Sequence, residues 1–172
     1  MRVEVFALFF GIAYLSAGLL GLHPDALMPP AADAPPIEFT LKYGYLLGVF
    51  PVNLLHSAVH LAVGAWGIMA WRHVVSPLVF ARALAILYGA LAAMGLIPGL
   101  NTLFGMLPLH GHDVWLHAGT AAVAAFFALR PELAVEHRAS DTLDRREEPL
   151  PVAGERRHGH NDRRLPSVGE EI

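Results

Sequence analysis

The sequence predicts an all-α integral membrane protein: a four-helix bundle followed by a polar tail. Four apolar stretches lie within the first 130 residues, at 3–22, 51–71, 75–97 and 114–129, and each is about as long as a helix that crosses a bilayer. Hydrophobic residues make up 55% of the 172 residues and charged residues only 16%, which is far from the balance of a soluble protein. Residues 131–172, by contrast, are strongly polar.

The first apolar segment carries one early charge, Glu4, and ends at His23 and Pro24. Its apolar run is longer than that of a signal peptide, so we expect a retained transmembrane helix. The connection that follows is rich in proline, including Pro29 and Pro36. Proline lacks an amide donor and crowds the preceding turn, so this connection is predicted to be irregular and to lie outside the hydrocarbon.

Aromatic residues in 39–50 predict a segment at the membrane interface that leads into the second helix. Pro51 suits the first turn of that helix, where a missing amide donor costs nothing. The helix is predicted to run to Trp71, before Arg72 and a short turn that includes Ser76.

The third segment holds Arg82 close to its first turns, where the side chain can extend to the interface; a pair with Glu4 is the alternative. Pro98 ends the segment. The next loop delivers Asp113, whose carboxylate is predicted to cap the fourth helix at 114–129.

Positive charge predicts the orientation. Lys42 lies in a loop on one side, whereas the termini and the loop between the second and third helices share the other side with the arginines Arg2, Arg72, Arg82, Arg130 and Arg138. Positively charged loops stay in the cytoplasm, so both termini are expected there, with residues 131–172 as a disordered cytoplasmic tail. The expected partner is the lipid bilayer, with other membrane-protein subunits as further candidates and no nucleic acid.

A short internal repeat suggests duplication of a two-helix unit. The stretch around Tyr14 resembles the stretch around Tyr88, and Leu55-His56 resembles Leu116-His117. Since the paired helices run in the same direction, the duplication would be parallel.

Histidine is the one polar residue type concentrated near the helices, and it supplies the candidate site. A zinc or copper ion is one possible ligand, held by nitrogen and oxygen donors from the set His56, His60, His110, His112, Asp113 and His117. A haem b held between His56 and His117 is a second. In a third interpretation each imidazole only hydrogen-bonds a neighbouring helix, while Asn53 and Asp113 cap helices or orient a ligating histidine.

The remaining motifs argue against catalysis. The chain has no cysteine, which excludes disulfides and thiolate sites, and it lacks a phosphate-binding loop, a Ser/His/Asp set and an HExxH motif. We therefore expect a small non-enzymatic membrane protein without a cofactor, acting as an accessory or assembly subunit of a larger complex. The alternative is a metal- or haem-binding protein. A channel would need more polar groups within the membrane.

The stretches VNLLHSAVHLAVGAWGI, HDVWLHAGTA and YGALAAMGL resemble a bacterial membrane family known as domain of unknown function 4383. The resemblance covers roughly residues 3–130 and implies a four-helix protein of the bacterial plasma membrane. The matching positions are Asn53, His56, Asp113 and His117, in N-x-x-H and D-x-x-L-H elements, whereas His60 is an addition. The family has no established activity, so the resemblance implies topology rather than mechanism.

Overall fold

The computed structural model describes residues 2–130, so the predicted polar tail at 131–172 lies outside the described residues. The fold consists mainly of four α-helices: α1 (Val3–Leu22), α2 (Leu54–Trp71), α3 (Pro77–Gly95) and α4 (His112–Ala128). Between α1 and α2 lie a short 3-10 helix, η1 (Pro24–Ala26), and the strands β1 (Leu27–Met28), β2 (Gly44–Leu46) and β3 (Phe50–Val52).

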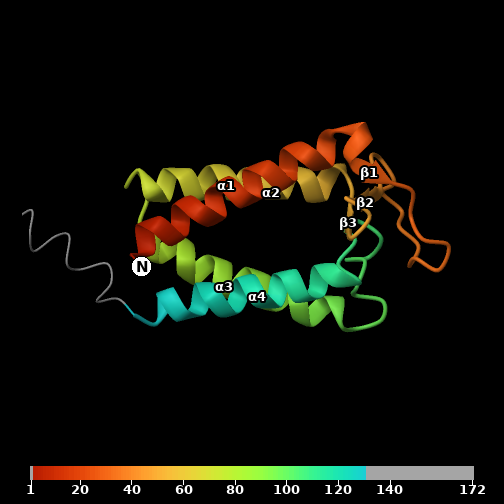
Figure 1. The fold of residues 1–172 in the computed structure, drawn as a ribbon. Coiled ribbons are helices and arrows are strands. Elements are labelled where there is room, and N and C mark those ends of the chain that lie inside the picture. Colours follow the sequence, from red (N-terminus) through yellow and green to blue (C-terminus); the bar gives the residue numbers. More distant parts are fainter. Residues whose placement is uncertain (1, 131–172) are drawn as a thin grey trace, which may run out of the picture.

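The helices form two hairpins that face each other (Figure 1). α1 packs along α2, and α3 packs along α4, with smaller contacts between the hairpins. Side chains from all four helices meet in one core cluster, which includes Phe6, Val63, Phe80, Leu84 and Phe127. Burial of this apolar surface is what joins the two hairpins in the described part of the chain.

Glycine brings α1 and α2 into backbone contact. A Cβ added at Gly67 would lie 2.7 Å from the Cα of Gly11, and one added at Gly64 would lie 2.9 Å from the carbonyl oxygen of Gly11. Only residues without a side chain allow helices to approach this closely. Glycine residues on both helices thus allow the first hairpin to form.

The connection between α1 and α2 is more ordered than predicted, and the all-α expectation is wrong in this segment. The strands form a small antiparallel sheet in the order β1-β2-β3, with Tyr45 opposite Pro51. Pro51 therefore belongs to β3. The prediction that Pro51 lies in the first turn of α2 is wrong. β3 is an edge strand, where the missing amide donor of proline is tolerated.

Two helices begin in different ways. Ser76 caps α3, with its hydroxyl accepting from the amide of Val79. The prediction that Asp113 caps the fourth helix is wrong: α4 begins at His112, and its N-cap is Gly111 at a φ of 67°. That backbone conformation favours glycine, and it moves Asp113 into the first turn, where its side chain is buried.

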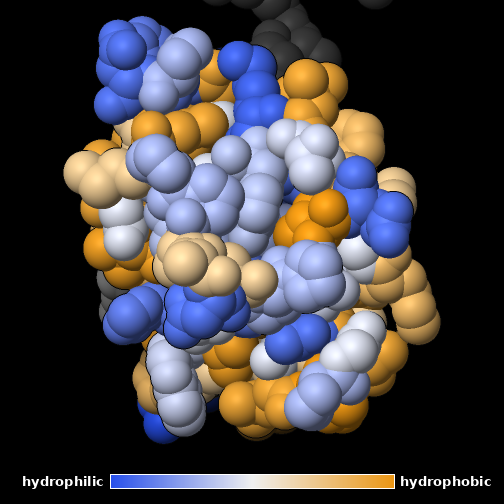
Figure 2. All heavy atoms as spheres, turned by 90° about the vertical axis from the view of Figure 1, so that its right-hand side faces the viewer, coloured by the Kyte–Doolittle hydropathy of each residue, from blue (hydrophilic) through white to orange (hydrophobic). Residues whose placement is uncertain are grey.

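Three of the helices, α1, α2 and α3, are long and apolar enough to cross a membrane. Their outer faces carry large apolar side chains, among them Phe9 at 63% exposure and Ile86 at 75%, as expected where lipid replaces water. The sheet and the α3–α4 connection lie together at one end of the helices (Figure 1). Figure 2 looks onto this end, where hydrophilic side chains lie across the surface and hydrophobic ones gather around its margin.

The pattern of burial agrees with the predicted internal repeat. Val3, Phe6, Ala7 and Tyr14 are buried on α1, and residues at the same spacing are buried on α3, namely Pro77, Phe80, Ala81 and Tyr88. α1 and α3 therefore present equivalent faces to the core.

Candidate functional site

Three buried histidines from two helices meet near the end of the fold that carries the sheet. His56 and His60 lie one turn apart on α2, and His117 lies in the second turn of α4. The Nε2 atoms of His56 and His60 are 3.2 Å apart, and one ring nitrogen from each of the three residues lies within 4.8 Å of the others. We call these residues the histidine cluster.

Asn53 fixes the position of His56. Its side-chain oxygen accepts from the amide of His56 at 2.9 Å, which caps α2 as the sequence predicts. Its amide nitrogen donates to the carbonyl oxygens of Phe39 at 3.0 Å and Met106 at 2.7 Å. The fully buried side chain of Asn53 thereby links the α1–α2 and α3–α4 connections to the first turn of α2, which carries His56.

The side chain of Asp113 lies next to the ring of His117. Its Oδ2 lies 3.5 Å from Nδ1 of His117, and both side chains are only 1% exposed. A carboxylate beside one ring nitrogen orients the ring and leaves the other nitrogen to bind a metal. Of the two roles that the sequence suggested for Asp113, orientation of an imidazole fits this geometry.

Two tyrosines enclose the cluster toward the centre of the fold. The ring centroid of Tyr14 lies 5.1 Å from that of His60, and the centroid of Tyr88 lies 5.0 Å from that of His117. The hydroxyl of Tyr14 pairs with that of Thr120 at 2.8 Å. Sequence reasoning did not assign these residues to the site, although Tyr14 and Tyr88 mark equivalent positions of the repeat.

Nδ1 of His60 is buried beside the cluster and has no hydrogen-bond partner in the described structure. Nδ1 of His117 and Oδ2 of Asp113 also lack a hydrogen bond, although these two atoms face each other at 3.5 Å. Unpaired buried polar atoms are costly in proteins and usually mark a bound ion, water or ligand. Their concentration here distinguishes this place from the apolar core.

Two histidines predicted for the metal site lie elsewhere. His112 is exposed at the start of α4, and the ring of His110 is 6.3 Å from that of Tyr45. Burial lowers the pKa of His110. Within residues 2–130, the group of side chains able to share one ion contains neither of them. Gly111 caps α4, so His110 lies in the preceding loop and His112 is the first, exposed residue of the helix; H-x-H spacing alone could not show this.

Arg82, predicted to extend toward the interface, is exposed on α3. The ion pairs within residues 2–130 do not include a pair between Arg82 and Glu4. The exposed position agrees with the first of the two interpretations of this arginine.

The spacing of the cluster suits a small ion better than a haem. Two imidazole nitrogens that share a tetrahedral zinc at about 2.0–2.1 Å lie roughly 3.3 Å apart, close to the 3.2 Å between His56 and His60. A porphyrin between His56 and His117 would need a clear plane beside His56. His60 occupies that space, since its Nε2 lies within hydrogen-bonding distance of His56.

Comparison with protein-family models matches residues 4–130 to a family described as a domain of unknown function, DUF4383. The match agrees with the resemblance found in the sequence and covers every described helix. Comparisons with curated proteins and with solved structures gave no match.

Proposed function

Because the chain belongs to the DUF4383 family of unknown function, its role has to come from its own residues, and we propose that it is a metal-binding membrane protein. The histidine cluster holds a borderline divalent cation, zinc or copper, through one nitrogen each from His56, His60 and His117. The observation that supports this is the convergence of three buried imidazoles within 4.8 Å, a donor set that both ions favour.

The surroundings support an ion as well. Asp113 faces the nitrogen of His117 that would not bind the metal, in the manner of carboxylates that orient metal-bound histidines. Three protein ligands leave a fourth position for water or a transferred ligand. We propose binding or handing over of the ion, without catalysis, because the sequence offers no nucleophile motif beside the cluster.

We further propose that all four helices cross the plasma membrane of a bacterium, with both termini in the cytoplasm. α4 has 17 residues, about the lower limit for a crossing helix. Arg2, Arg72 and Arg130 lie at the end opposite the sheet, and the positive-inside rule assigns that end to the cytoplasm. The histidine cluster then lies near the outer surface.

A role as accessory subunit is the second candidate. Trp115 at 70% exposure lies in the first turn of α4, and Phe104 at 75% lies in the α3–α4 connection. Exposed aromatic side chains are common where proteins meet. Crosslinking in native membranes tests this role, which is rejected if only monomer is recovered at every crosslinker length.

The metal proposal is tested on full-length protein in detergent. After chelation and dialysis, zinc or Cu²⁺ is titrated calorimetrically, and bound metal is measured by mass spectrometry. We expect about one ion per chain, and loss of that binding in His117→Ala. His112→Ala is the matched control, because this histidine lies on the same helix but outside the cluster. Substoichiometric metal in the wild-type protein, or equal loss in both variants, would reject the proposal.

A further inference from the structure

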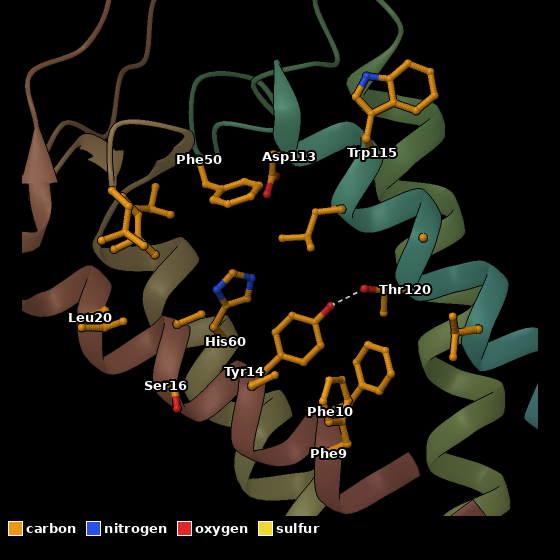
Figure 3. A pocket seen from close by; sticks show the side chains of 18 residues that line it. Phe9, Phe10, Tyr14, Ser16, Leu20, Phe50, His60, Asp113, Trp115 and Thr120 are labelled. Carbon is orange, nitrogen blue, oxygen red and sulfur yellow. Dashed lines mark hydrogen bonds between the residues drawn. The ribbon is translucent and has the colours of Figure 1, made fainter. Parts of the chain in front are cut away.

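A cavity of about 610 Å³ lies between the two hairpins, on the side where α1 faces α4 (Figure 3). Its wall comes mainly from these two helices, together with residues of β2 and β3 and His60 of α2. α1 packs mainly on α2, and α4 packs mainly on α3, so the two helices stand apart here. In the proposed membrane orientation, this gap opens sideways into lipid.

Most of the lining is apolar, and aromatic rings are prominent in it. Phe10 and Tyr14 contribute from α1, and Phe50 contributes from β3. Figure 3 shows the rings of Tyr14 and Phe50 directed into the same space from opposite sides. Trp115 stands at the margin. Aromatic faces set around one space suit a flat ring, which can stack on them.

Polar groups reach the cavity at two places. His60 and Asp113 line one part. Nδ1 of His60 is buried there and has no hydrogen-bond partner in the described structure, whereas Oδ2 of Asp113 faces Nδ1 of His117. The hydroxyl pair of Tyr14 and Thr120 lines another part. One hydrogen joins the two hydroxyls, so the second hydroxyl hydrogen remains able to donate. A ligand here meets polar groups on two sides of an otherwise apolar space.

We propose that this cavity binds an isoprenoid quinone, with the ring between Tyr14 and Phe50 and the chain leaving between α1 and α4. A quinone ring is flat and carries two carbonyl oxygens on opposite edges. One oxygen accepts from the Tyr14–Thr120 hydroxyl pair, and the other accepts from Nδ1 of His60 in the tautomer that carries its proton there. The isoprenoid chain is apolar, so it can remain in lipid beside Phe9 and Val123 on the cavity wall. The volume lies within the range of small-molecule sites.

A saturated lipid chain explains the lining less well. Such a chain fills an apolar gap, but it pairs with neither the remaining hydroxyl hydrogen of the Tyr14–Thr120 pair nor Nδ1 of His60, and unpaired buried polar groups oppose its binding. The proposal does not depend on an ion in the histidine cluster. The two can therefore be tested separately on chelator-treated protein.

The experiment measures quenching of tryptophan fluorescence by ubiquinone-2 in full-length, detergent-purified, chelator-treated protein. We expect saturable quenching, because Trp115 stands at the cavity margin. Gly119→Leu should weaken binding about tenfold or more. A Cβ at Gly119 meets no atom within 4 Å, so the new side chain fills the cavity without disturbing the helix packing. Ala93→Leu, a similar enlargement at an exposed position of α3, should bind as the wild type does.

Two further arms identify what the site recognises. Tyr14→Phe removes a hydroxyl group and keeps the ring, so it should weaken binding severalfold while thermal unfolding shows a folded protein. Geraniol has the isoprenoid chain of ubiquinone-2 but no quinone ring, and it should fail to displace the quinone. Non-saturable quenching, equal affinity in Gly119→Leu and Ala93→Leu, or displacement by geraniol at equal concentration would overturn the proposal. Zinc binding that persists beside such a result would leave the metal proposal standing.

Discussion

Asn53 joins more separate parts of the candidate site than any side chain around it for which hydrogen bonds are described. Its oxygen caps α2 at His56, and its amide holds one carbonyl oxygen from each of the two long connections. Since the side chain is fully buried, water cannot replace these partners. Loss of the amide would leave both carbonyl groups and the helix amide unpaired.

Asn53→Ala is expected to lower the free energy of unfolding by about 2–4 kcal/mol, which combines a lost cap with buried carbonyl groups left without donors. Thermal unfolding in detergent measures the change. Ser76→Ala is the comparison, because Ser76 caps α3 through one exposed bond, and it should cost about 0.5–1 kcal/mol. Equal losses in both variants would show that the contacts of Asn53 to the connections contribute nothing.

A substitution at Asp113 tests the metal proposal through a single side-chain group. Asp113→Asn keeps the size of the side chain but replaces the carboxyl group beside Nδ1 of His117 with an amide. Loss of such an orienting carboxylate typically weakens metal binding by about 10–100-fold. We therefore expect a reduction of that size in zinc affinity, measured by competition with a chromogenic chelator. Unchanged affinity would mean that Asp113 does not orient His117 toward an ion.

At the scale of elements, the apolar segments predicted the helices well, because a bilayer-length apolar run has few alternatives to a helix. The sheet was missed since its strands have two or three residues each, too short for an alternating pattern to show. The start of α4 was missed for a different reason. A glycine with positive φ, Gly111, replaced the expected carboxylate cap, and backbone conformation is not visible in residue type.

The first hairpin depends on backbone contact. Gly67→Ala places a methyl group 2.7 Å from the Cα of Gly11, where no flexible side chain can move aside. Overpacking of this kind typically costs about 1–3 kcal/mol, so we expect a lower unfolding temperature. Gly119→Ala is the matched control on α4, because its new Cβ meets nothing within 4 Å; it should be neutral or slightly stabilising. An unchanged unfolding temperature in Gly67→Ala would contradict this prediction, because it would mean that α1 and α2 can move apart without loss of stability.

At the scale of the whole molecule, the sequence predicted only part of the histidine cluster. His56 and His60 share a helix face by spacing alone, and the repeat paired His56 with His117. The packing of the two hairpins then brings all three within reach of one ion. The role of Tyr14 and the cavity between α1 and α4 depend on how the hairpins face each other, which neither composition nor spacing specifies.

Orientation in the membrane is the last property that the charge pattern predicts and that an experiment can decide. The chain has no cysteine, so single cysteines can be introduced without background. Ala32 is exposed in the connection that joins β1 to β2, and Val74 is exposed in the turn between α2 and α3. These positions lie at opposite ends of the helices (Figure 1).

A maleimide that cannot cross membranes should label Ala32→Cys in intact cells and Val74→Cys only after the cells are opened, because arginine-rich loops stay in the cytoplasm. The reverse pattern would place the histidine cluster near the cytoplasm. Labelling of both variants in intact cells would show that the helices do not cross the membrane as proposed.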